Sequence, residues 1–177
     1  DSWMPPGVFG ARRCHGAADA SWWVTTRLEQ SRFQPLGLTA VSLDDEKFFD
    51  RLWLPALQQL AQQIHLTPPY LRCLEQYANI RRHLLLDGYP TGLLLEGPFP
   101  GGIPQGCPLA PFFAALTGAA WELYLGTESS AFTWLLSYLD DRMILCQESK
   151  TLDDLLLATF RLDEWLGTQV HMGKSKW

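Results

Sequence analysis

The sequence predicts an α+β domain in which an antiparallel sheet is backed by helices. Short apolar runs bounded by glycine or charged residues have the length of buried strands, and longer segments repeat their apolar residues with helical spacing. The two kinds of segment are mixed along the chain, as expected when strands and helices build one layered core. The sequence has no internal repeat and no Gly/Ser linker, so we expect one continuous unit.

The first half of the chain is expected to hold three helices and one strand. Residues 16–31 have helical spacing, and the apolar run 38–43 leads into Asp44 as a buried strand would. Residues 55–64 begin with a proline that suits the first turn of a helix, and the next helix starts at Pro68. The candidate inward-facing residues of these helices are Ala18, Trp22, Leu28, Leu57, Leu60, Ala61, Ile64, Leu71, Leu74 and Ala78.

The middle of the chain combines a hairpin, a loop and a helix. Strand-like runs at 81–86 and 92–95 flank the turn residues 87–90, which predicts a hairpin. The Gly- and Pro-rich segment 97–111 cannot be regular structure, and it leads into an apolar helix at 112–125.

The last part of the chain is expected to form a second hairpin and a helix. The apolar runs 132–139 and 143–146 are separated only by Asp140-Asp141-Arg142, the pattern of a tight hairpin with two acids at its tip. Residues 152–166 have helical spacing. The candidate buried residues of this helix are Leu155, Leu156, Phe160 and Leu166.

Composition and charge limit the classes of function. The chain has 177 residues, of which 47% are hydrophobic and 19% charged, a balance typical of one globular domain. A net charge of -5 argues against binding nucleic acid by bulk electrostatics, although bound cations would offset clustered carboxylates. The four cysteines lack a CxxC pair, which favours a reducing, intracellular setting without a zinc site, and no segment has the length of a membrane span. Since the chain begins at Asp1 and ends at Trp177 inside a motif, we interpret it as an excerpt.

Three aspartates stand where strand residues are rarely acidic. Asp44 ends a predicted strand, and Asp140 and Asp141 lie at the predicted hairpin tip. Aspartate is a poor strand former, and adjacent anions repel each other unless a positive charge lies between them. A divalent cation would remove that repulsion. The ordinary alternative is a polar turn at 140–141 and a solvated strand end at 44–47.

Four segments, in this order, resemble the motifs of reverse transcriptases. They are 42–52 (SLDDEKFFDRL) for the first catalytic motif, 102–111 (GIPQGCPLAP) for the Gly-x-Pro-Gln-Gly-x-Pro-x-x-Pro loop, 138–141 (YLDD) for the Tyr-x-Asp-Asp hairpin, and 173–176 (GKSK) for the Lys-containing motif. Residues 9–12 and 19–20 are similar to a fingers motif of the enzymes of non-long-terminal-repeat retrotransposons and group II introns. The resemblance covers residues 8–176.

The resemblance implies a polymerase palm with part of the fingers. Residues 1–36 would form a fingers segment and residues 37–177 the palm with a fingers insertion, whereas the thumb and other domains would belong to a larger parent protein. By the same resemblance, Asp44, Asp140 and Asp141 hold two Mg²⁺ ions, with Mn²⁺ as an alternative, and Lys174 assists the leaving pyrophosphate.

The resemblance also assigns contacts with the nucleotide and with the nucleic acid. Phe49 matches the aromatic position below the incoming sugar, although Phe48 beside it competes for that role. The other residues with implied nucleotide contacts are Arg12, Gln105 and Gly106. Those assigned to template or primer are Tyr138 and Pro104.

Three functions follow as hypotheses. The first is an RNA-directed DNA polymerase core that uses an RNA template, a DNA primer and deoxynucleotides, with no membrane partner. The second is a catalytically inactive retroelement fragment that binds nucleic acid or a protein, which the acidic charge and the altered residues after Arg12 favour. The third is another palm enzyme, such as a nucleotide cyclase or an RNA-templated RNA polymerase. Phe49 and the Tyr-x-Asp-Asp form weigh against this third hypothesis.

Overall fold

A four-stranded sheet forms the centre of the molecule. The computed structural model describes residues 3–33, 37–80, 83–94, 102–104, 106–126 and 133–176. The sheet order is β1-β5-β6-β2, and its strands are β1 (Val8–Phe9), β2 (Thr39–Asp44), β5 (Thr133–Tyr138) and β6 (Asp141–Cys146). β2 and β5 pair with β6 in antiparallel orientation, whereas β1 is parallel to β5. The predicted α+β class is confirmed, but the sheet is mixed because the two-residue β1, too short to produce a sequence pattern, adds a parallel edge.

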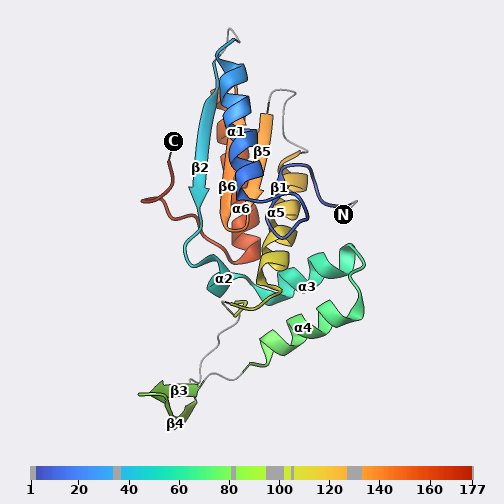
Figure 1. Ribbon diagram of the computed structural model, residues 1–177, viewed down its shortest axis with the longest axis vertical. Helices are drawn as coiled ribbons and strands as arrows, with labels where there is room; N and C mark the ends of the chain where they lie inside the picture. Colours follow the sequence, from blue (N-terminus) through green and yellow to red (C-terminus); the bar gives the residue numbers. More distant parts are fainter. Residues whose placement is uncertain are drawn as a thin grey trace.

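Helices cover both faces of this sheet (Figure 1). α1 (Ala17–Ser31) crosses one face, and α5 (Ala110–Gly126) and α6 (Ser149–Leu166) cover the other. α2 (Phe48–Arg51), α3 (Leu54–Gln63) and α4 (Pro68–Ala78) lie beyond the end of the sheet at which β2 stops. The segment that resembles the first catalytic motif of reverse transcriptases therefore continues from β2 into α2 at that end of the sheet.

The main core lies between the sheet and helices α5 and α6. Val41, Leu43 and Ile144 from the strands meet Trp121 of α5 and Leu155 of α6, and all five are almost fully buried. A second core joins α2, α3, α4 and the start of α5. This core anchors the helices that follow β2 against α5.

One helix presents a different face from the expected one, and two others each expose one residue that was expected to be buried. Ala18, Trp22 and Leu28 of α1 are exposed, and Ala20 packs on the sheet together with Trp23 and Val24. Either Trp22 or Trp23 could face the core, depending on which side of the helix is turned inward. Ala20 is small enough to lie where α1 crosses β1 closely, and this turns Trp23 inward. Phe160 of α6 is 38% exposed and Ala78 of α4 is exposed, so these expectations were also wrong.

Both expected hairpins are present. β3 (His83–Leu86) and β4 (Tyr89–Leu94) pair in antiparallel orientation across a turn in which Asp87 and Gly88 both have positive φ. In the second hairpin the turn is at Leu139 and Asp140, and β6 starts at Asp141. The expected tip at 140–142 was therefore one residue late, because Leu139 takes the left-handed conformation (φ 56°).

The four cysteines are free thiols. Within the described ranges, no helix combines the length and the apolar composition needed to cross a lipid bilayer.

Candidate active site

Strand register places two of the three candidate carboxylates opposite each other. Asp44, the last residue of β2, pairs with Asp141, the first residue of β6, and Tyr138 of β5 pairs with Asp141 on its other side. Side chains of directly opposed residues lie on the same face of a sheet with their Cβ atoms about 5 Å apart. Asp140 occupies the turn immediately before Asp141. Segments almost 100 residues apart therefore bring the three acids to one end of the sheet.

The carboxylates influence one another electrostatically. Partial burial, together with the negative charges of Asp140 and Asp44, raises the pKa of Asp141. One carboxylate oxygen of Asp44, Oδ2, is buried and accepts no hydrogen bond from any described residue. The ammonium of Lys174 lies 3.6 Å from this oxygen, too far for a hydrogen bond and close enough for an ion pair. The site thus has more negative charge than its own cation balances.

Hard carboxylate oxygens of this kind suit Mg²⁺ or Mn²⁺. A buried Asp44 oxygen without a hydrogen bond from any described residue, and the repulsion between carboxylates that raises the pKa of Asp141, are features that a site for a divalent cation would have. Among the described residues, however, no group of three or more Asp, Glu, His or Cys side chains is already arranged to hold a metal ion. The three acids nevertheless share one end of the sheet.

The segment after α6 fixes the backbone of Asp44. His171 donates its backbone N–H to the carbonyl of Asp44 (2.7 Å), and the N–H of Asp44 donates to the hydroxyl of Ser175 (3.2 Å). Ser42 and Lys176 exchange two further backbone hydrogen bonds, each 2.9 Å long. This segment carries Lys174, so the same contacts that hold the strand end also place the lysine beside the carboxylate.

A cavity of about 610 Å³ opens beside the turn that carries Asp140. Its lining residues are Phe49, Gly106, Cys107, Ala110, Pro111, Leu139 and Asp140. This volume lies in the range of small-molecule sites. Three residues proposed from separate motifs, Phe49, Gly106 and Asp140, therefore line one space.

Backbone hydrogen bonds tie two walls of the cavity together. Gly102 donates to the carbonyl of Leu52 (2.8 Å), and Ile103 donates to that of Phe49 (2.7 Å). Gly102 has φ +100°, and a Cβ there would lie 2.9 Å from the carbonyl oxygen of Asp50, so only glycine fits. The Pro-Gln-Gly loop thus starts in direct contact with the short helix α2.

The two adjacent phenylalanines have different environments. Phe48 is 6% exposed and belongs to the core around α3 and α5, whereas Phe49 is half-buried and lines the cavity. Only Phe49 is therefore placed to meet a bound ligand. The thiol of Cys107, also in the lining, shares a hydrogen bond with the hydroxyl of Tyr77 on α4.

The remaining candidate residues lie in different surroundings. Pro104 is half-buried in the loop, and Tyr138 packs beside the cluster formed by α1, β1 and β5. Arg12 donates from Nη1 to the carbonyl of Pro5 (3.1 Å) and is absent from the cavity lining. Gln105 lies outside the described residues.

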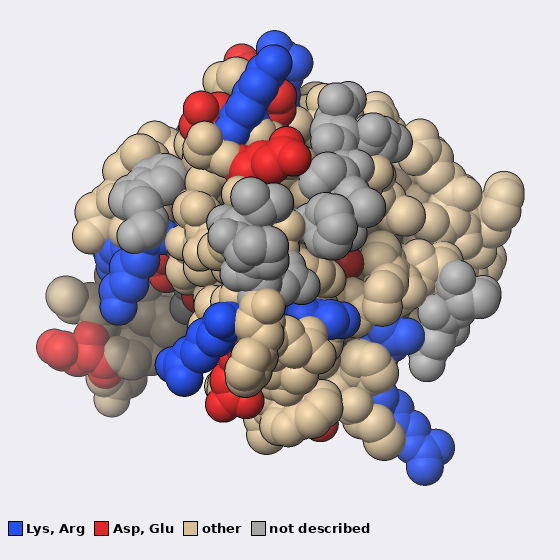
Figure 2. All heavy atoms as spheres, turned by 90° about the horizontal axis from the view of Figure 1, so that it is seen from above, with Lys and Arg blue, Asp and Glu red and all other residues tan. Residues whose placement is uncertain are grey.

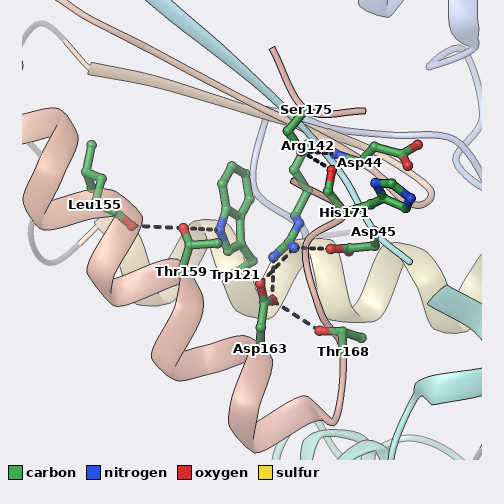
Figure 3. Close-up of polar contacts among 10 residues, drawn as sticks. All are labelled: Asp44, Asp45, Trp121, Arg142, Leu155, Thr159, Asp163, Thr168, His171 and Ser175. Carbon is green, nitrogen blue, oxygen red and sulfur yellow. Dashed lines mark hydrogen bonds and ion pairs between the residues drawn. The ribbon is translucent and has the colours of Figure 1, made fainter. Parts of the chain in front are cut away.

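Sequence reasoning missed a buried ionic cluster behind the carboxylates (Figure 3). Arg142 is 6% exposed and donates to Asp45 and Asp163, whose side chains are 1% and 4% exposed. Burial raises the pKa of Asp45 to about 7 despite the opposing effect of Arg142. Burial would lower the pKa of Arg142, but the charges of Asp45 and Asp163 outweigh it and raise that pKa. An available signal was Asp163, which falls on the same helical stripe as Leu155, Leu162 and Leu166.

The sheet ends in opposed carboxylates beside a ligand-sized cavity, and helices pack behind it. This is the arrangement of a polymerase palm. The profile of the family described as "Reverse transcriptase (RNA-dependent DNA polymerase)" matches residues 3–177. Because this match covers nearly the whole sequence, the chain belongs to the reverse transcriptase family. The resemblance expected from the motifs is confirmed.

The chain is similar to parts of a curated relative and of two solved structures, each of them a longer protein. The RNA-directed DNA polymerase from the mobile element jockey of Drosophila melanogaster is 26% identical over 165 residues, which make up 92% of this chain and 17% of the relative. Telomerase from Candida tropicalis, solved in complex with a TWJ fragment of telomeric RNA, has a TM-score of 0.71 at 14% identity and covers 96% of this chain. The equivalent Candida albicans complex has a TM-score of 0.62 at 14% identity over 92% of this chain. This chain spans 30% of each telomerase chain, and at such identities the likeness concerns the fold.

Proposed function

We propose that this chain is the catalytic core of an RNA-directed DNA polymerase that adds deoxynucleotides to a DNA primer on an RNA template. The observation that carries the proposal is the convergence of the carboxylates: Asp44 opposes Asp141, and Asp140 lines the same cavity as Phe49. Family membership and the jockey relative support this activity, and the family as a whole depends on divalent metal ions. The chain spans only 17% of the jockey relative. The activity of a complete protein is therefore also a proposal.

In this proposal Asp44, Asp140 and Asp141 hold two Mg²⁺ ions, or Mn²⁺ in their place. Two such ions would make the primer hydroxyl more nucleophilic and neutralise the leaving pyrophosphate in one in-line displacement. The primer 3'-hydroxyl would lose its proton to water, and its oxygen would bond to the α-phosphorus while the bond from that phosphorus to the bridging oxygen breaks and releases pyrophosphate. Lys174, beside Asp44, is placed to give a proton to the pyrophosphate or to balance its charge.

The walls of the cavity would select and hold the nucleotide. Phe49 lines this cavity, and in the proposal its ring would pack below the sugar and exclude a 2'-hydroxyl. Gly106, and Gln105 beside it in sequence, would lie along the nucleotide and template, because a glycine lets the backbone approach closely. Pro104 and Tyr138 are assigned to template or primer, and Arg12 to the triphosphate. In the present structure Arg12 would first have to leave the carbonyl of Pro5.

The domain division also belongs to the proposal. Residues 1–36 are assigned to the fingers and residues 37–177 to the palm with a fingers insertion. β1, at residues 8–9, pairs with β5, so the fingers segment would be anchored on the palm sheet.

A second candidate is an inactive retroelement fragment that binds nucleic acid or a protein. The net charge of -5 favours it, and on the face seen in Figure 2 basic side chains are interspersed with acidic ones instead of forming one patch. Binding a polyanion usually requires clustered positive charge. The two candidates predict opposite results in one assay.

The test is Mg²⁺-dependent primer extension on an RNA template, using the chain extended at both ends by its natural flanking sequence. We expect extension by the wild type and none by Asp140→Asn. Asp153→Asn, which alters an exposed acid on α6, is the matched control and should retain activity. Equal extension by Asp140→Asn would remove Asp140 from the mechanism, and no extension by any version would favour the binding module.

A further inference from the structure

The ionic cluster around Arg142 joins three elements behind the carboxylates. The guanidinium donates from Nη2 to Asp45 Oδ1 at 2.5 Å and to Asp163 Oδ2 at 3.0 Å, and from Nη1 to Asp163 Oδ1 at 2.7 Å. The hydroxyl of Thr168 donates to Asp163 (3.1 Å), and Arg142 lies over the ring of Trp121 at 5.7 Å (Figure 3). Arg142 of β6 therefore joins the residue that follows β2 to α6, and Thr168 extends the cluster to the segment after α6.

Each strand places a candidate metal ligand on one face and a member of this cluster on the other. Asp45 follows Asp44 at the end of β2, and Arg142 follows Asp141 at the start of β6. Successive side chains of a strand point to opposite faces. In Figure 3 the carboxylate of Asp44 points away from the guanidinium, whereas that of Asp45 points towards it. The ion pair between Asp45 and Arg142 thus bridges the two strand ends that carry Asp44 and Asp141.

The wall beside the guanidinium is itself fixed. The indole of Trp121 is 1% exposed and donates from Nε1 to the hydroxyl of Thr159 (3.0 Å), which donates to the carbonyl of Leu155 (2.8 Å). A planar guanidinium with several donors can bond two carboxylates at once while stacking on an aromatic ring. Arg142 has little room to move without breaking several of these contacts.

Stability alone is a weak explanation for this cluster. Two carboxylates and one guanidinium are removed from water, and Asp45 Oδ2 and Arg142 Nε have no hydrogen-bond partner among the described residues. Replacing buried ion pairs with well-packed apolar side chains is often neutral or stabilising. The directional hydrogen bonds of the cluster hold the two strand ends in fixed positions relative to α6.

We propose that Arg142 is a positioning residue, which sets the separation of Asp44 and Asp141 by holding Asp45 and Asp163 behind the sheet. This inference rests on the proposed polymerase function. Arg142 itself would touch neither substrate nor metal, because its side chain lies on the opposite face from the carboxylates. Partners behind metal ligands are known to affect metal affinity and activity by about 10- to 100-fold.

The test compares variants that keep or remove the bridge between the strands. Asp45→Asn retains an oxygen that can accept from Arg142, whereas Asp45→Leu and Arg142→Gln break the bridge. Arg161→Gln is the matched control, because it changes an exposed arginine on α6. All variants are made in the chain extended at both ends.

The measurements are kcat and KM for the deoxynucleotide, Mn²⁺ affinity from electron paramagnetic resonance titration, and thermal unfolding. For Arg142→Gln and Asp45→Leu we expect kcat and Mn²⁺ affinity each to fall by about 10- to 100-fold, while KM for the deoxynucleotide stays near the wild-type value. Asp45→Asn should recover most of both quantities, and Arg161→Gln should match the wild type.

Wild-type kcat and Mn²⁺ affinity in Arg142→Gln, with only a lower unfolding temperature, would overturn the inference. If Arg142→Gln does not fold, the triple variant Asp45→Asn/Arg142→Met/Asp163→Asn leaves no buried charge unpaired. In that variant, weakened Mn²⁺ binding supports the inference and wild-type binding overturns it. If the wild type itself extends no primer, the proposed function has failed, and the Mn²⁺ titrations still decide the role of Arg142.

Discussion

Glu122 is expected to make the stability of the fold depend on pH. This residue of α5 is 7% exposed, and it accepts hydrogen bonds from the hydroxyl of Ser137 and from the backbone of Gly7. Burial raises its pKa from 4.5 to about 8, against the smaller lowering effects of these bonds and of Arg12. The folded state therefore binds a proton that the unfolded chain has already lost between these pH values.

The sign and size of the effect follow from this difference in proton binding. Because the folded state binds more protons, the free energy of unfolding decreases as pH rises from about 4.5 to about 8. Each pKa unit corresponds to about 1.36 kcal/mol, so the loss across that interval is on the order of 5 kcal/mol. Glu122→Gln keeps the shape and one acceptor oxygen but cannot ionise. We expect the variant to match the wild type near pH 5 and to be several kcal/mol more stable near pH 8.

Urea unfolding followed by tryptophan fluorescence at pH 5, 6.5 and 8 measures this difference. Glu75→Gln, which changes an exposed acid on α4, is the control and should show the wild-type pH dependence. Parallel pH profiles for the wild type and Glu122→Gln would refute the reasoning, because they would mean that Glu122 does not bind the extra proton in the folded state.

Three further substitutions test the site and its support. Gly102→Ala should lower the free energy of unfolding, measured by urea denaturation, by about 2 to 4 kcal/mol, because of backbone strain and a clash with Asp50. The control is Gly37→Ala, because a Cβ at that position would meet no described atom within 4 Å. It should lower the free energy of unfolding by only about 1 kcal/mol. Phe49→Val should raise incorporation of ribonucleotides relative to deoxynucleotides by about tenfold, measured by single-nucleotide primer extension, and unchanged selectivity would exclude Phe49 as the gate. Trp121→Phe should cost about 1 to 3 kcal/mol in thermal unfolding, because it removes the hydrogen bond between α5 and α6.

The sequence predicted those parts of the fold that local patterns determine. β2 and its end at Asp44 followed from an apolar run and the charges after it, and the hairpin carrying Asp140 followed from two such runs separated by acids. The direct pairing of Asp44 with Asp141 was not predictable at residue resolution, because register depends on how the strands meet in space. The expected convergence of the acids is supported by the geometry, whereas their roles as metal ligands stay predictions.

Packing decided what the patterns left ambiguous. Trp22 and Trp23 each fit a helical phase, and the contact of Ala20 with the sheet selected Trp23. Charged residues are normally assigned to the surface, so Arg142 could not be recognised as buried before its partners were placed, although Asp163 lies on the apolar stripe of α6. Composition and residue spacing could not predict which residues of distant segments contact one another.

The strand that ends at Asp44 is an outer strand of the sheet, and its free edge is closed by a segment far along the chain. The bond from the Asp44 N–H to Ser175 spans 131 residues. At synthesis rates of about 5 to 20 residues per second, roughly 7 to 26 s would separate emergence of the two partners from the ribosome. During that interval the unpaired amide and carbonyl groups of this edge are open to pairing with other nascent chains, so a chaperone that shields it would most affect the yield of correctly folded protein.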